Sequence, residues 1–115
     1  GELSDTAYFN LSVLSINGGE TVPIQYSLGQ NYPNPFNGST NIPFTIQDET
    51  GVQLTLYDLK GQYVNTLVNK RLKAGIHNQM WNGLDFSGHQ VASGIYYYQL
   101  VCDDYHQSKK MVFLK

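Results

Sequence analysis

Alternation of apolar and polar residues is the feature that most limits how this chain can fold. The segment VQLTLYD places Val52, Leu54 and Leu56 on one side and Gln53, Thr55 and Tyr57 on the other. A period of two predicts a strand with one buried face. Similar segments recur about every 8 to 14 residues with turn residues between them, and none has a sustained helical period. The sequence therefore predicts an all-β fold, an antiparallel β-sandwich of about seven strands.

The other strands of the sandwich are predicted from the same pattern. They are TNIPFTIQ, QYVNTLVN, IHNQMWNG, IYYYQLVC and HQSKKMVFLK. KRLKAG is interpreted as a basic connection and LDFSGHQVASG as a long loop. Pro43 lies inside the first of these strands, and because proline cannot donate a ladder hydrogen bond, it predicts an edge position or a bulge.

The N-terminal part of the chain is predicted to lie outside the sandwich. YFNLSVL alternates like a strand, and the polar, glycine-rich SINGGETVP that follows is interpreted as a linker. Residues 1–22 are therefore expected to be a linker or the last strand of a preceding domain. Residues 23–115 are expected to be the domain itself, entered through QNYPNPFNGST (residues 30–40), whose prolines are incompatible with a regular helix or central strand.

Composition excludes several classes of function. Charged residues make up 14% of the chain and the formal net charge is −2, so a nucleic-acid partner is not expected. No apolar run approaches the roughly 20 residues of a membrane-spanning helix. The low charge, with many Tyr, Asn, Thr and Gly residues, is typical of an exported β-protein.

No group of residues has the pattern of a catalytic, metal or cofactor site. Cys102 is the only cysteine and lies in an apolar strand pattern, so a buried thiol is expected. The histidines are dispersed without metal-ligand spacing. Asp58 and Asp85 each precede a glycine by three residues, which predicts tight turns in preference to weak calcium sites. We therefore expect no enzyme, no cofactor and no metal.

Four blocks of sequence, taken in order, resemble one family. These are YSLGQNYPNPFNGSTNIPF, LYDLKGQYVNTLV, AGIHNQMWNGLDFSGHQVASGIYYYQL and KKMVFLK, spanning residues 26–115. They resemble the type A C-terminal sorting domains of the type IX (Por) secretion system of Bacteroidetes. The chain departs from the family pattern at turn positions, with Gly38 where proline is common and Asn82 where aspartate is common. The family is also similar to the immunoglobulin-like domain of flagellar hook-capping proteins, which implies an immunoglobulin-like sandwich here.

The resemblance implies a function. Such a domain follows an exported cargo protein, directs it across the outer membrane, and is commonly cleaved off or used in cell-surface anchoring. The implied partners are type IX translocon or shuttle proteins, a sortase-like peptidase and the attached cargo. The implied location is the periplasm in transit and then the cell surface or the extracellular space.

The resemblance and the local pattern together select candidate residues. The candidate sorting-motif residues are Pro33, Asn34, Pro35, Phe36, Gly94, Tyr96, Lys110, Val112, Leu114 and Lys115. The candidate cleavage-linker residues are Asn17, Gly18, Gly19 and Glu20, because exposed glycine-bearing segments are where proteolysis concentrates. We expect the prolines to fix how the linker leaves the sandwich, and the terminal strand to offer a receptor an ordered edge flanked by lysines.

Two other functions fit parts of the sequence. A carbohydrate- or surface-binding module would use exposed aromatic rings, with Tyr97 the candidate because it alternates away from Tyr96 and Tyr98. An assembly domain would use the N-terminal strand YFNLSVL to pair with the sheet edge of a second copy and form a weak homodimer.

Overall fold

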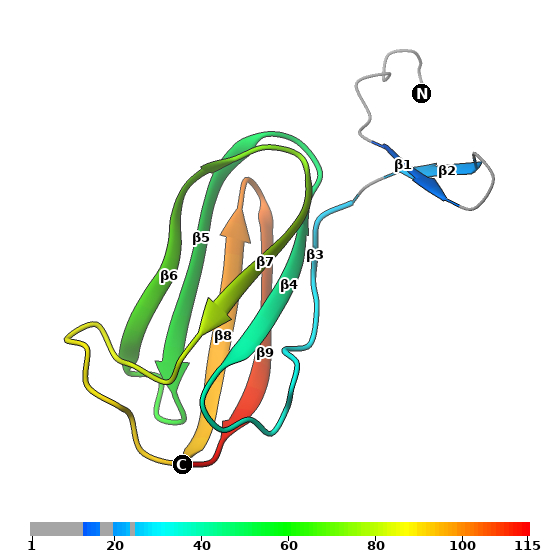
Figure 1. The fold of residues 1–115 in the computed structure, drawn as a ribbon. Helices are drawn as coiled ribbons and strands as arrows, with labels where there is room; N and C mark the ends of the chain where they lie inside the picture. Colours follow the sequence, from blue (N-terminus) through cyan, green and yellow to red (C-terminus); the bar gives the residue numbers. More distant parts are fainter. Residues whose placement is uncertain (1–12, 17–19, 24) are drawn as a thin grey trace.

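The computed structural model describes residues 13–16, 20–23 and 25–115 (Figure 1). Seven strands form two antiparallel sheets, as predicted. One sheet has the order β3-β4-β7, with β3 at Ser27–Leu28, β4 at Thr40–Ile46 and β7 at Gly75–Trp81. The other has the order β6-β5-β8-β9, with strands at Tyr63–Leu72, Thr50–Asp58, Gly94–Cys102 and Tyr105–Phe113. The all-β sandwich predicted from the alternation is therefore confirmed.

The core lies between the two sheets, where the alternating side chains of each strand point inward. Val52, Leu54 and Leu56 of β5 are buried, as expected, and β8 buries every second residue from Tyr96 to Cys102. Trp81, at the end of β7, is 1% exposed and is the largest side chain of the core. The remaining members are apolar residues of β4, β6 and β9, with Leu28 of β3 and Phe36, which lies between β3 and β4. Removal of this apolar surface from water is the main force that holds the two sheets together.

Part of the predicted linker forms a hairpin. β1 (Val13–Ile16) and β2 (Glu20–Pro23) pair antiparallel as a two-stranded sheet of their own. Residues 15–16 and 20–23 of the segment interpreted as a linker are thus in paired strands, and the division of the chain after residue 22 stays a prediction. Residues 1–12 of the predicted N-terminal strand region, and residues 17–19 of the predicted cleavage linker, lie outside the described residues.

Pro43 does not lie in an edge strand, contrary to prediction. β4 is the central strand of its sheet, between β3 and β7. Gly29 N–H donates to the carbonyl oxygen of Pro43 at 2.8 Å, so the ring nitrogen faces the side on which β3 has already ended at Leu28. The sheet therefore loses no ladder hydrogen bond at this proline.

The connections between strands differ in one place from those predicted. Residues 70–72 continue β6 as a paired strand and do not form a separate basic connection, because Val52, Gly51 and Thr50 extend opposite them. The loop from residue 82 to residue 93 is long, as expected, and an isolated bridge between Leu84 and Gln90 closes it. This loop lies at the same end of the sandwich as residues 30–40 and the chain's last residues (Figure 1).

Candidate functional site

The entrance segment, defined here as residues 30–40, passes from the edge of one sheet to the edge of the other. Near its start, Tyr32 and Asn41 exchange two backbone hydrogen bonds of 2.9 Å, which attach it to β4. Four residues later, Phe36 forms a parallel bridge with Phe113 of β9. The segment therefore closes one open side of the sandwich and connects both sheets.

Hydrogen bonds join the entrance segment to the backbone of the terminal strand. Phe36 N–H donates to the Val112 carbonyl at 3.0 Å, and Leu114 N–H donates to the Phe36 carbonyl at 2.9 Å. The Asn34 side-chain oxygen accepts from Val112 N–H at 2.9 Å. Gln30 Nε2 donates to the Lys110 carbonyl at 2.9 Å. The free edge of β9 is thus occupied from Lys110 to Leu114, and the ordered edge expected for a receptor is not open along this stretch.

We call the contact between the entrance segment and residues 110–114 the junction. Three aromatic rings pack against it on the core side. The ring centroids of Phe36 and Phe113 are 5.0 Å apart, and those of Phe36 and Trp81 are 5.7 Å apart. Trp81 Nε1 donates to the Leu84 carbonyl at 2.8 Å, which satisfies its polar atom. Gly83 has a φ of +79°, and a β-carbon there would lie 2.9 Å from Phe113 Cζ. The Phe113 ring therefore requires a glycine at position 83.

A buried polar network holds the first half of the entrance segment. Asn31 is 2% exposed, and its Nδ2 donates to Thr40 Oγ1 at 3.0 Å. Thr40 Oγ1 in turn donates to the Pro33 carbonyl at 2.8 Å. The Tyr98 hydroxyl accepts from Asn31 N–H and donates to the Gly29 carbonyl, both at 2.8 Å. Burial raises the pKa of Tyr98 to about 12, so the hydroxyl stays protonated as a donor.

The structure brings the predicted sorting-motif residues to one end of the molecule. Gly94 pairs with Phe113 and Tyr96 with Met111, so the start of β8 lies beside the end of β9. The Tyr96 hydroxyl donates to the Ala92 carbonyl at 2.6 Å, and Lys115 N–H donates to Ser93 Oγ at 2.8 Å. The predicted residues from the entrance segment complete the cluster through the bonds described above. Of the predicted cleavage residues, Glu20 lies in β2 opposite Ile16.

Several residues of the junction were not predicted. They are Gln30, Asn31, Thr40, Trp81, Gly83, Ser93 and Tyr98. Asn31 and Thr40 flank the proline-rich stretch, and polar residues in such a stretch ordinarily face water. The backbone N–H of Asn31 donates to the hydroxyl of Tyr98, a residue of β8 that is 67 positions away in the sequence. No local pattern in the sequence indicates this partner.

The surface of the junction carries positive charge and amide groups. Lys110, Lys115 and the prolines at positions 33 and 35 are exposed, and Leu114 is 49% exposed. No acidic residue occurs among residues 30–40 or 105–115. A partner that contacts these two segments therefore meets cationic and apolar side chains, with Asp58 of β5 beside Tyr96 as an acidic neighbour.

The two aspartate segments form the turns that were predicted. Asp58 Oδ1 accepts from the backbone N–H groups of Lys60 and Gln62, and Asp85 Oδ1 accepts from those of Ser87 and His89. The hydrogen bond from His89 N–H is the main cause that lowers the pKa of Asp85. Among the described residues, no three His, Cys, Asp or Glu side chains gather in a group that could hold a metal ion.

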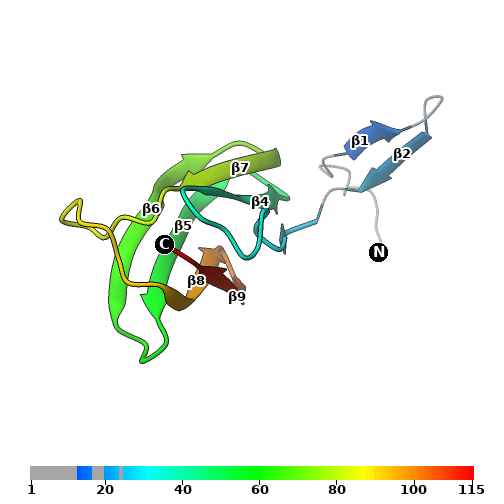
Figure 2. The same cartoon turned by 60° about the horizontal axis from the view of Figure 1, so that its bottom comes forward.

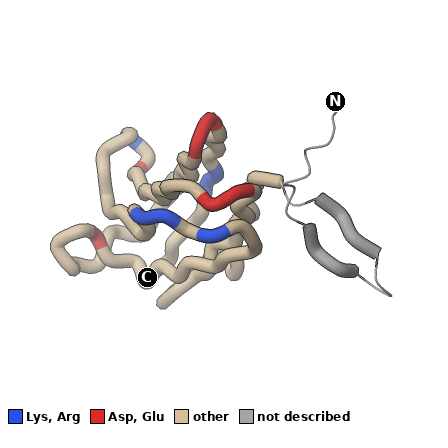
Figure 3. The backbone as a smooth tube through the Cα atoms, turned by 90° about the horizontal axis from the view of Figure 1, so that it is seen from above, with Lys and Arg blue, Asp and Glu red and all other residues tan. Residues whose placement is uncertain are grey.

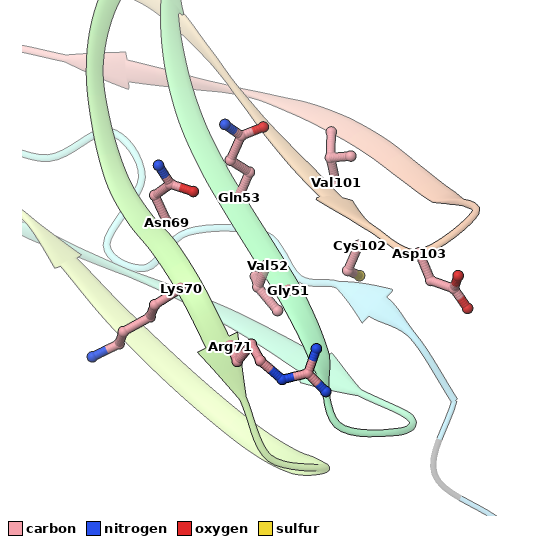
Figure 4. Close-up of a pocket in the computed structure, with 9 residues that line it drawn as sticks. All are labelled: Gly51, Val52, Gln53, Asn69, Lys70, Arg71, Val101, Cys102 and Asp103. Atoms are coloured by element: carbon pink, nitrogen blue, oxygen red, sulfur yellow. The ribbon is translucent and has the colours of Figure 1, made fainter.

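A hollow at the opposite end of the four-stranded sheet does not have the chemistry of a nucleophilic site. It has a volume of about 320 Å³, and its walls come from β5, β6, the end of β8 and the β8–β9 turn (Figure 4). The lining residues are Gly51, Val52, Gln53, Asn69, Lys70, Arg71, Val101, Cys102 and Asp103. Cys102 is buried, as predicted. Burial raises the pKa of its thiol, and the negative charge of Asp103 raises it further. The thiol is therefore protonated and weakly nucleophilic at neutral pH.

The outer face of the four-stranded sheet contains the aromatic residue considered for carbohydrate binding. Tyr97 is half-buried, and its neighbours across the strands are Tyr57 and Lys110. Tyr96 and Tyr98 point into the core, as the alternation predicted. In the part of the chain that the structure describes, no helix has the length and apolar character needed to cross a membrane.

Comparison with known proteins identifies a family and shows similarity to solved structures. A family model described as "Secretion system C-terminal sorting domain" matches residues 30–114. No curated protein matches the chain. Dimeric latent PorU from Porphyromonas gingivalis has a TM-score of 0.65 and 19% identity, covering 86% of this chain. PorZ, a surface component of the type-IX secretion system of the same organism, has a TM-score of 0.49 and 18% identity, covering 78% of this chain. The match spans 10% of the PorU chain and 11% of the PorZ chain.

Proposed function

This chain belongs to the secretion system C-terminal sorting domain family, and we propose that the junction between its entrance segment and its terminal strand is the surface that the secretion machinery reads. As a sorting domain of the type IX system, it directs an attached protein toward the cell surface. The family is one of sorting signals and not of catalysts. The activity of the whole cargo protein is separate from the function proposed here.

One observation carries the proposal: the entrance segment is hydrogen-bonded along the backbone of β9 between Lys110 and Leu114. Because these backbone groups are already paired, a receptor has little to gain there by adding a strand of its own. We infer that it recognises the exposed side chains of the junction, with Lys110 and Lys115 as the charged contacts. Such charges steer encounter and set specificity more than they set affinity.

The route and the partners follow from this proposal. The folded domain passes through the periplasm attached to its cargo and is bound there by a type IX translocon or shuttle protein. A sortase-like peptidase then separates the cargo from the domain between residues 17 and 20, and the cargo is released or anchored at the cell surface. The domain itself acts without a cofactor, metal or catalytic group.

A secretion assay tests whether the secretion machinery recognises the junction. The full chain is placed behind a Sec signal and a fluorescent reporter, in a bacterium with a working type IX system and in its translocon-null mutant. We expect the reporter outside the first strain and in the periplasm of the second. The Lys110→Glu/Lys115→Glu variant is expected to remain in the periplasm of both strains.

Two controls make the assay specific. Lys70→Glu/Lys73→Glu makes the same charge change at exposed positions at the other end of the sandwich and is expected to be secreted. Periplasmic protease resistance of each variant shows that the domain has folded. Secretion of the folded Lys110→Glu/Lys115→Glu variant at the normal rate would contradict the proposal that the machinery recognises the junction. Equal retention of the unmodified chain in both strains would contradict the export function itself.

A further inference from the structure

The two open sheets have four edge strands, and three of them are protected against pairing with another chain. β3 has only two residues. β9 carries Lys109 and Lys110 and is covered along its end by the entrance segment. β6 carries Lys70 and Arg71 near its end, and its Val64 carbonyl accepts from Phe86 N–H at 2.9 Å. Short length, charge and cover are the usual devices by which edge strands avoid unwanted pairing.

The fourth edge strand, β7, has none of these devices in the part of the chain that the structure describes. It has seven residues and lies at the margin of its sheet, with β4 as its neighbour (Figure 2). β3, β4 and β7 contain no Asp, Glu, Lys or Arg, and charged residues are sparse along the backbone as a whole (Figure 3). Ile76 is 61% exposed and Met80 is 56% exposed. Such a strand is a template for another strand.

The direction of the free backbone groups follows from the register. Asn41 and Pro43 use their backbone groups toward Tyr32 and Gly29, so the even-numbered residues of β4 bond to β7. Those residues face Gly75, His77, Gln79 and Trp81. The N–H and C=O groups of Ile76, Asn78 and Met80 therefore point away from β4. Among the described residues, the one bond to these groups that leaves the ladder is from Gln79 Nε2 to the Met80 carbonyl, at 3.1 Å, and a carbonyl can accept a second bond.

We propose that β7 pairs antiparallel with β7 of a second copy of this chain, about a two-fold axis at Asn78. In this register Asn78 lies opposite Asn78 of the second copy. Ile76 lies opposite Met80, and Met80 opposite Ile76. All three pairs are of the hydrogen-bonded kind because the outward backbone groups belong to the same three residues. The two three-stranded sheets become one sheet of six strands.

The chemistry of β7 favours its own copy over a charged partner. A two-fold interface uses the same surface on both copies, so the surface must complement itself. Here an apolar side chain meets an apolar side chain and an amide meets an amide, while no like charges face each other. The flanking outward residues Pro43, Thr45 and Asn41 are uncharged as well, so the continuous outer face contains no repulsive pair. This inference concerns the folded domain alone and is independent of export.

Sedimentation velocity of the full chain over a concentration series tests the interface. The weight-average mass is expected to rise from that of one chain toward that of two. Asn78→Lys places two lysines opposite each other at the axis and is expected to weaken dimerisation about tenfold or more. Asn78→Ser is the uncharged control and is expected to dimerise like the unmodified chain. Fluorescence of the single buried tryptophan, Trp81, confirms that each variant is folded.

A charge pair tests the register. Ile76→Lys is expected to give a monomer, and adding Met80→Glu is expected to restore the dimer at low salt, because each lysine then faces a glutamate of the other copy. Ile76→Lys/Thr45→Glu has the same charges, but Thr45 pairs with Ile76 inside one chain, so it should not restore the dimer. A monomer at every concentration, or dimerisation of folded Asn78→Lys at the normal strength, would overturn the proposal. Equal rescue by Thr45→Glu would overturn the register.

Discussion

The side-chain oxygen of Asn34 accepts a hydrogen bond of 2.9 Å from the backbone N–H of Val112, 78 residues away in the sequence. The amide oxygen of Asn34 thus takes the place of the backbone carbonyl that a neighbouring strand would offer to this N–H group. The bond lies beside the two backbone bonds between Phe36 and the strand end. The entrance segment therefore satisfies backbone groups at the outer edge of β9, although it is not itself a regular strand.

Replacement of Asn34 tests the strength of this bond. Asn34→Ala is expected to lower the free energy of unfolding by about 0.5–1.5 kcal/mol, the usual net contribution of a protein hydrogen bond. Urea denaturation followed by Trp81 fluorescence measures it. Asn37→Ala changes an exposed asparagine of the same segment and is expected to have a smaller effect. Equal effects of the two variants would mean that the bond to Val112 N–H does not stabilise the fold.

The aromatic contact between Phe36 and Phe113 is expected to couple the two segments. Either Phe→Ala change should destabilise the domain by about 3–5 kcal/mol, because both rings are buried. A double-mutant cycle in denaturant should give a coupling energy of about 0.5–1.5 kcal/mol, as aromatic pairs at this distance do. Additive effects would show that the rings stabilise the core separately. If the alanine variants do not fold, the same cycle can be measured with Phe36→Leu and Phe113→Leu.

The Tyr98 hydroxyl predicts a dependence of stability on high pH. Its folded pKa of about 12 lies above the unfolded value near 10. Between these values the unfolded chain loses the proton while the folded chain keeps it, so stability present below pH 10 declines as the pH rises toward 12. Tyr98→Phe should be destabilised at neutral pH, because the Gly29 carbonyl and Asn31 N–H lose their partner, and should show a shallower alkaline decline. Denaturation midpoints at several pH values test both parts, and an unchanged slope in Tyr98→Phe would contradict the assignment.

The close approach of Gly83 to Phe113 predicts a strong difference between two glycines. Gly83→Ala combines a positive φ with a β-carbon 2.9 Å from an aromatic ring, and we expect a loss of about 1–3 kcal/mol or more. Gly51→Ala is the control, since nothing lies within 4 Å of its added β-carbon and alanine is less flexible than glycine in the unfolded chain. Thermal unfolding of both variants makes the comparison. Similar midpoints would show that the ring moves aside at little cost.

The strands and the inward residues were predictable because alternation is a local property. Val52, Leu54 and Leu56 are buried for the reason that the pattern indicates. The place of Pro43 was not predictable, because the sequence does not reveal that β3 ends at Leu28 before reaching the proline nitrogen. Lys70 and Arg71 have the composition of a connection, yet the partner strand β5 extends far enough to pair with them.

The candidate site was only partly predictable for a similar reason. The proline-rich entrance and the terminal strand could each be selected by resemblance, but their direct contact is a property of the fold. Asn31 and Gln30 were overlooked because their partners are Tyr98 and the Lys110 carbonyl, both far away in the sequence. Long-range hydrogen bonds of this kind leave no periodic signal.

The junction also determines when, during synthesis of the chain, folding of the domain can finish. Residues 30–36 emerge early during synthesis from the N-terminus, and their partners at residues 110–114 emerge last. A contact of such long range forms only after nearly the whole domain has been made. A chain that stops before Phe113 lacks the ring that fills the end of the core. The finished junction therefore requires that translation has continued at least to Leu114, and a receptor that binds the junction as proposed would not bind chains that stop before this residue.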